Sequence, residues 1–206
     1  MSHFTVLVIG KDVDKQLAPY DENKKRTVDP KWDWYVIGGR WGGYFTLKPG
    51  KTGTLREPST FDKLDGDKRD HAKVDQALKG DIDFDAMRRD AGDKARERYQ
   101  IMADLLGGTI PSIVPWKELI DKPEYKAMDI DAKRTFYHGQ EPLARLRAQS
   151  KNPAFSKAAQ ELAIWSEYDD FLCTEETYVE RAKNRAVSTF AVVMRGQWYE
   201  KGSMGW

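Results

Sequence analysis

The sequence predicts an α+β fold, with a small, mostly antiparallel sheet built from N- and C-terminal strands around a large helical insertion. Strand-like runs rich in β-branched and aromatic residues lie at about 3–9, 33–48 and 188–201, whereas about 83–186 has helical periodicity. Strands and helices are segregated along the chain, so alternating βαβ units are not expected. A chain of 206 residues is long enough to bury its own core, and we expect a single domain over 1–206.

Each strand is bounded by turn-forming residues. The run HFTVLVI at 3–9 is almost continuously apolar and stops at Gly10, which is typical of a central strand. Short strands at 33–37 and 44–48, joined through two glycine pairs, predict a hairpin, with Trp34 and Phe45 in the core. Residues 49–73 have no period and predict an irregular segment.

The C-terminal part predicts a second hairpin, with a strand at 188–195, a turn at 196–198 and a strand after it.

The middle of the chain predicts helices with clear start and stop signals. Asp83 or Asp85 can cap a helix that runs to about Leu106, and Gly107–Gly108 end it. Proline residues start or break the later helices. These further helices are expected near 116–121, 131–149, 154–168 and 174–186.

Composition narrows the classes of function. Lys and Arg total 34 against 33 Asp and Glu, so the chain lacks the strong positive charge of a duplex-DNA binder. No apolar run approaches the ~20 residues that span a bilayer, so we expect no membrane partner. Cys173 is the only cysteine, which forbids an intrachain disulfide and fits a cytoplasmic location.

Short motifs for cofactors and metals are incomplete. Gly50-Lys51-Thr52 has the end of a phosphate-binding loop, but a glycine is missing five positions earlier and no helix is expected to follow. The spacing of Asp81, Asp83 and Asp85 resembles a calcium loop that lacks its later glycine and glutamate, so helix capping explains these acids better. We therefore expect neither a cofactor nor a metal.

A weak catalytic candidate lies at the start of the chain. His3 and Thr5 form an HxT pattern, which resembles half of the motif of two-histidine phosphodiesterases, where the histidine transfers a proton and the threonine holds phosphate. Neither His71 nor His138 is followed two residues later by Ser or Thr, so the second half is missing. A strand-end histidine with a structural role is the favoured interpretation.

The segment KWDWYVIGGRWGGYF at 31–45 is the strongest candidate for a binding site. Its tryptophans can stack on a flat ligand, its glycines let backbone N–H groups approach an anion, and Arg40 can grip a phosphate or a carboxylate. Alternatively, the aromatic residues cover a sheet face and Arg40 pairs with an internal acid such as Asp33. A similar Trp/Gly/Lys group near the C-terminus can share the cleft. The ligand-binding candidates are Trp32, Gly38, Gly39, Arg40, Trp41, Trp198 and Lys201.

Five motifs together resemble an uncharacterised family of bacteriophage and prophage proteins: SHFTVLVIG, QLAPYDEN, KWDWYVIGGRWGGYF, DQALKGDIDFDAMR and GQWYEKGSMGW. The resemblance implies a phage accessory protein in the cytoplasm of a bacterial host, and it assigns no activity, fold or catalytic residue. Members of this family continue past the MGW motif into a further strand, so either an open sheet edge or an incomplete site is expected if that strand is absent.

These observations lead to two functional hypotheses. The first is a non-enzymatic phage accessory protein that acts on the host by binding a host protein or a nucleotide-like ligand, in a role such as counter-defence. The second is a small phosphodiesterase-like enzyme that acts on a phosphate-bearing substrate with His3, Thr5 and Arg40. The absence of a complete catalytic motif favours the first.

Overall fold

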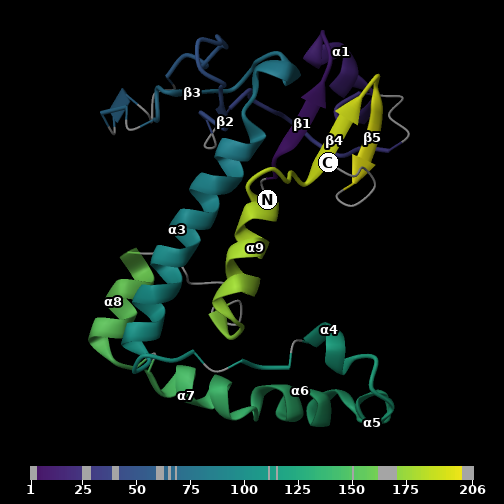
Figure 1. The fold of residues 1–206 in the computed structure, drawn as a ribbon. Coiled ribbons are helices and arrows are strands. Elements are labelled where there is room, and N and C mark those ends of the chain that lie inside the picture. Colours follow the sequence, from purple (N-terminus) through teal and green to yellow (C-terminus); the bar gives the residue numbers. More distant parts are fainter. Residues whose placement is uncertain are drawn as a thin grey trace. The chain divides into compact units, whose positions relative to one another are not determined.

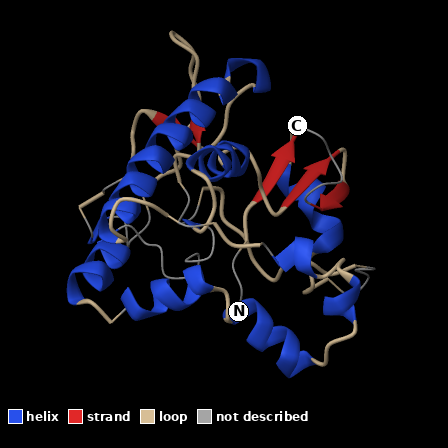
Figure 2. Ribbon diagram, turned by 60° about the horizontal axis from the view of Figure 1, so that its bottom comes forward, coloured by secondary structure: helices blue, strands red, loops and turns tan. Residues whose placement is uncertain are grey.

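The computed structural model describes residues 4–24, 29–38, 42–58, 63–64, 66–67, 69–110, 112–114, 116–149, 151–161 and 171–200. Along the chain it divides into two compact units, a first unit of Met1–Arg89 and Lys183–Trp206 and a second unit of Asp90–Ala182. Helices make up much of the described chain and strands only a small part (Figure 2). The predicted α+β class is confirmed, and the single domain stays a prediction. None of the described helices is both long and apolar enough to cross a membrane.

The first unit contains all the described strands together with short helices. Its elements are β1 (Val6–Ile9), α1 (Val13–Leu17), η1 (Ala18–Tyr20), β2 (Phe45–Thr46), β3 (Lys73–Val74), η3 (Lys79–Asp81), β4 (Ala191–Met194) and β5 (Gln197–Glu200).

The main sheet joins the two ends of the chain, as predicted. Its strand order is β1-β4-β5, so the purple β1 lies beside the yellow β4 (Figure 1). β1 is parallel to β4, which the long intervening connection permits, and β4 is antiparallel to β5. Arg195 and Gly196 connect β4 to β5 with φ of 54° and 73°, as a two-residue type I′ turn requires. The predicted N-terminal strand and C-terminal hairpin are thus confirmed.

The predicted hairpin over 33–48 is wrong. β2 pairs antiparallel with β3, which falls at the end of the segment expected to be irregular. Residues 33–38 form no strand. The carboxylate of Asp33 accepts a hydrogen bond from the Trp34 N–H at 2.9 Å. Such local side-chain bonds compete with a strand ladder.

An apolar cluster fills the interior of the first unit. Phe45 is buried as predicted, and Leu7 of β1 packs against the cluster. The buried members come from β2, β3, the residues after η3, the following helix and the approach to β4. They are Phe45, Val74, Ile82, Met87 and Val187.

The long helix α3 (Phe84–Leu105) confirms the predicted start and stop signals. The Asp83 carboxylate accepts the Ala86 N–H at 2.7 Å, so Asp83 is the N-cap. At the other end, the Gly108 N–H bonds to the Ala103 carbonyl at 2.7 Å and the Gly107 N–H to the Asp104 carbonyl at 3.2 Å. With φ of 91° and 96°, the two glycines complete a Schellman motif that ordinary residues form less easily.

The shorter helices follow the predicted stretches with two exceptions: the helix expected over 131–149 is two helices, and a helix over Pro123–Lys126 was not predicted. Residues 162–168 of the helix expected over 154–168 lie outside the described residues. The Gly139 N–H caps the first of them on the Thr135 carbonyl at 2.8 Å, and Pro142 occupies the first turn of the second, where its missing N–H costs nothing. These elements are α4 (Trp116–Leu119), α5 (Pro123–Lys126), α6 (Ile130–His138), α7 (Glu141–Gln149), α8 (Pro153–Glu161) and α9 (Glu175–Arg185).

Candidate binding cleft

The beginning of the aromatic–glycine segment is anchored to the short helices after β1. The Lys31 N–H and the Trp32 N–H both donate to the Tyr20 carbonyl, at 2.9 and 3.3 Å. The Trp32 indole Nε1 donates to the Leu17 carbonyl at 3.2 Å. The polar edge of the Trp32 side chain is therefore occupied by the protein itself, although its ring is only half-buried.

Tyr35 adds a second anchor from the same segment. Its hydroxyl donates a hydrogen bond to the Asp14 carboxylate of α1, and its ring meets Trp32 edge to face, with centroids 5.1 Å apart. Burial, followed by the hydrogen bond to Asp14 and the negative charge of Asp14, raises the pKa of Tyr35 to about 12. Tyr35 is thus a protonated donor at neutral pH.

Three apolar side chains of this segment face solvent. Trp34, Val36 and Ile37 are 52%, 58% and 39% exposed. The prediction that Trp34 is in the core is wrong, because no strand forms here to turn it inward. Contiguous exposed apolar side chains on a folded domain commonly mark an interaction site.

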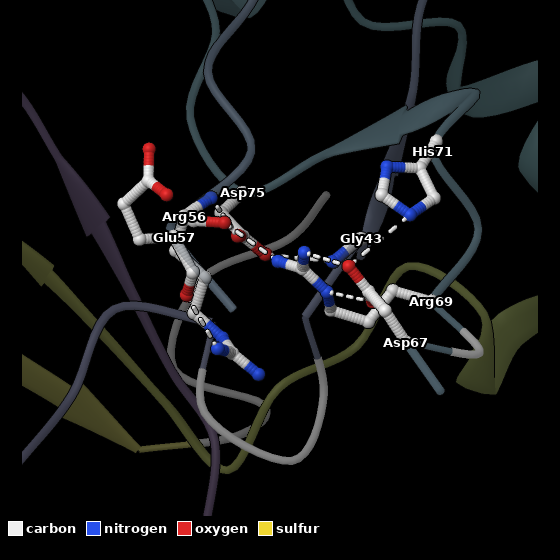
Figure 3. A network of polar contacts seen from close by, with 7 residues as sticks. All are labelled: Gly43, Arg56, Glu57, Asp67, Arg69, His71 and Asp75. Carbon is white, nitrogen blue, oxygen red and sulfur yellow. Dashed lines mark hydrogen bonds and ion pairs between the residues drawn. The ribbon is translucent and has the colours of Figure 1, made fainter. Parts of the chain in front are cut away.

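Asp75 binds the glycine-rich part of the segment (Figure 3). One carboxylate oxygen accepts the Gly43 N–H at 2.7 Å and the other accepts the Arg56 N–H at 2.8 Å. Gly38 has φ of +77°, and a Cβ there would lie 2.7 Å from the same carboxylate. From the sequence we expected the glycine N–H groups to bind the anion of a ligand. At Gly43 the N–H instead binds the carboxylate of Asp75, a side chain of the protein itself. The sequence does not predict a role for Asp75, because its only distinction there is that it begins the DQALKGDIDFDAMR motif.

A second polar group fixes the neighbouring segment. Arg69 donates from Nε and Nη2 to the two oxygens of Asp67, each at 2.6 Å, and from Nη1 to the Arg56 carbonyl at 2.6 Å (Figure 3). His71 Nε2 lies 3.4 Å from Asp67. The hydrogen bonds from Arg69 lower the pKa of Asp67 to about 2. The Arg69 side chain is nearly buried, so this fork is a structural tie.

The first unit has an open hollow beside β1, with a volume of about 1870 Å³. Residues 4–13 and residues 31–38 line it. Parts of the segments 52–57 and 75–84 contribute further lining. We call this space the β1 hollow. It brings together Thr5, Trp32 and Gly38 of the predicted site residues.

Trp198 is not among the residues that line the β1 hollow. Its ring packs against Tyr20, with centroids 5.1 Å apart, and against Phe4 at 6.2 Å. The ammonium of Lys31 lies 6.0 Å from the centroid of the Trp198 ring. The structure therefore does not bring Trp198 and Gly38 into one cleft.

The remaining predicted site residues, His3, Gly39, Arg40, Trp41 and Lys201, lie outside the described residues. Their proposed roles stay predictions.

The incomplete motifs have structural roles. Lys51 pairs with Asp81 at 3.2 Å, and Asp83 caps α3. Within the described part of the chain, no three His, Cys, Asp or Glu side chains are grouped as a metal site requires.

Comparisons of the chain with protein-family models, with curated proteins and with solved structures found no match.

Proposed function

We propose that this protein is a phage accessory protein that acts on its bacterial host by binding a host protein, without catalysing a reaction. The five phage motifs support the setting, and countering a host defence system is the role that this setting favours. The observation that carries the binding is the exposed apolar group Trp34, Val36 and Ile37 on the lining of the β1 hollow. Exposed groups of this kind are stabilised by a partner that covers them.

The charges around the hollow favour a protein over a nucleotide-like ligand. A nucleotide phosphate is usually bound where cations outnumber acids. The described lining has no such excess, and the Gly43 N–H that an anion would use is taken by Asp75. The charged lining residues are the cations Lys11, Lys31, Arg56 and Lys79 and the acids Asp12, Glu22, Asp33, Glu57 and Asp75.

Native mass spectrometry of the tagged protein from phage-infected cells tests this proposal. We expect wild type to carry a host protein in a defined stoichiometry and Trp34→Ala to lose most of it. Ile130→Ala is the matched control, because Ile130 is a 74% exposed apolar residue of the second unit. A nucleotide-sized adduct in place of a protein, or a bare mass for all three forms, would contradict the proposal.

The phosphodiesterase alternative is tested separately. Thr5 lines the β1 hollow, but His3 and Arg40 lie outside the described residues, so no observation favours the alternative. We expect His3→Ala to stay folded and to leave the benefit to the phage unchanged in an infection assay. Loss of that benefit in a folded variant would support the enzyme instead.

A further inference from the structure

One edge of the main sheet is open on the side of the β1 hollow. Among the described residues, β1 pairs with β4 only, and on the β4 side the Thr5 carbonyl accepts the Phe190 N–H at 2.9 Å. In a parallel pair, each residue directs both its N–H and its C=O to one neighbour, and the next residue directs both away. Leu7 therefore faces β4, whereas Val6 and Val8 direct their backbone groups to the open edge.

Nothing in the described part of the chain pairs with that edge. Between described residues, no backbone hydrogen bond beyond the sheet involves Val6 or Val8, and no isolated bridge reaches them. Every residue of β1 lines the hollow, although successive side chains of a strand point to opposite faces. When residues that point to both faces of a strand line one space, that space lies along the edge of the strand.

The sequence of β1 does not protect this edge. Natural edge strands are usually blocked by lysine, proline, a bulge or an inward-pointing charge. β1 is VLVI, with four apolar side chains, three of them β-branched, and none of these devices. The exposed Trp34, Val36 and Ile37 line the same hollow and offer apolar contacts to the side chains of an added strand.

We propose that the β1 hollow binds an extended peptide segment of the partner protein as an added strand on β1. The backbone groups of Val6 and Val8 pair with the peptide main chain, and its alternate apolar side chains contact the residues 34–37. This inference rests on the proposed function, since it specifies how the host protein is held.

A second copy of this chain fits the same edge less well. Pairing β1 with its own copy requires both edges to approach each other across open solvent. Here β1 lines a hollow that is also lined by residues 31–38 and by parts of the segments 52–57 and 75–84. A single peptide strand can enter such a space, whereas a second folded sheet would meet its walls.

The test uses the full chain and a displayed library of linear peptides of about ten residues, which is long enough for one strand. Peptides enriched on wild type are then measured on Val8→Pro and Val8→Ile by biolayer interferometry. Proline removes only the outward N–H of Val8, and edge strands tolerate it there. Isoleucine keeps the N–H and the β-branched side chain.

We expect the enriched peptides to alternate apolar and polar residues. They should bind Val8→Ile within about twofold of wild type and Val8→Pro at least about tenfold more weakly, since the proline ring also blocks the approaching strand. Hydrogen exchange on wild type provides a readout that does not depend on folding of the variant. The bound peptide should slow exchange at the amides of Val6 and Val8.

Three results would overturn the inference. If the peptides bind Val8→Pro as wild type but lose affinity for Trp34→Ala, the hollow holds its partner in another way and only the proposed function survives. If wild type instead forms a concentration-dependent dimer that Val8→Pro abolishes, the occupant is a second copy. If no peptide is enriched and native mass spectrometry finds no bound protein, both the inference and the proposed function fail.

Discussion

The buried core of the second unit and the aromatic–glycine segment of the first unit use their apolar side chains in opposite ways. In the second unit, Met102, Phe155 and Phe171 are 0%, 0% and 1% exposed. In the aromatic–glycine segment of the first unit, Trp34 and Val36 are also hydrophobic, yet they are 52% and 58% exposed. Hydrophobicity alone therefore does not decide which residues form a core.

The difference follows from spacing along the chain. Apolar residues of α3, such as Ala95 and Met102, recur at helical intervals and so share one face that can be buried. Residues 34–37 are consecutive and belong to no helix or strand, so no single face collects them. Helical spacing therefore lets the apolar residues of α3 share a buried face, whereas Trp34, Val36 and Ile37 of the consecutive stretch 34–37 stay exposed.

The largest expected effect tests this contrast directly. Phe155→Ala should destabilise the protein by about 3–5 kcal/mol, because it removes a fully buried ring and leaves a cavity. Trp34→Ala removes a larger ring but should cost less than about 1 kcal/mol, since half of that ring is already in solvent. Urea unfolding followed by far-UV circular dichroism measures both.

Ile130→Ala is the control for an exposed apolar side chain, and it should change the free energy of unfolding by less than about 0.5 kcal/mol. If Trp34→Ala costs as much as Phe155→Ala, Trp34 belongs to a core and the contrast between the units fails.

The sequence predicted the helices well because their signals are local. The Asp83 cap, the Gly107–Gly108 stop and the apolar stripe of α3 each depend on residues a few positions apart. Terminal strands were also predicted, since runs such as VLVI have strong strand propensity. Their parallel pairing joins residues about 185 apart, and no local signal specifies it.

The candidate site was only partly predictable, because its key contacts are between distant residues. The aromatic–glycine segment was identified from composition, but its hairpin was wrong since Asp33 bonds locally to Trp34. Asp75 lies 32 residues from Gly43, and no spacing rule connects a lone aspartate to a glycine pair. The open edge of β1 became visible only once the strand order was known.

A smaller effect concerns the hydrogen bonds by which Asp75 stabilises the first unit. Asp75→Ala should destabilise it by about 2–3 kcal/mol, because the N–H groups of Gly43 and Arg56 lose their shared acceptor. Asp75→Asn keeps one carbonyl oxygen and should cost less. Thermal unfolding measures both variants. Equal losses would contradict the expectation that the remaining oxygen of asparagine still accepts a hydrogen bond, and an Asp75→Asn variant as stable as wild type would show that the carboxylate acts only by filling space.

A double-mutant cycle tests the close approach of Gly38 to Asp75. Gly38→Ala should destabilise the protein, since its φ is +77° and the added Cβ would lie 2.7 Å from the Asp75 carboxylate. In the Asp75→Ala background, only the backbone strain remains. The coupling between the two changes should be about 1 kcal/mol. Additive effects would mean that Gly38 and Asp75 do not meet.

The smallest expected effect is a loss of stability at acid pH that comes from Asp67 in the first unit. Asp67 has its pKa lowered from 3.8 to about 2, chiefly by hydrogen bonds from Arg69, so its contribution to stability is present above about pH 4. That contribution is lost as the pH falls toward about 2, when the carboxylate binds a proton and the fork with Arg69 weakens. The midpoint of urea unfolding, followed from about pH 5 to about pH 2, should therefore fall less steeply for Asp67→Asn than for wild type. Asp121→Asn, which removes a carboxylate that is 83% exposed, should follow the wild-type curve. Parallel curves for Asp67→Asn and wild type would show that the Asp67–Arg69 fork does not stabilise the first unit.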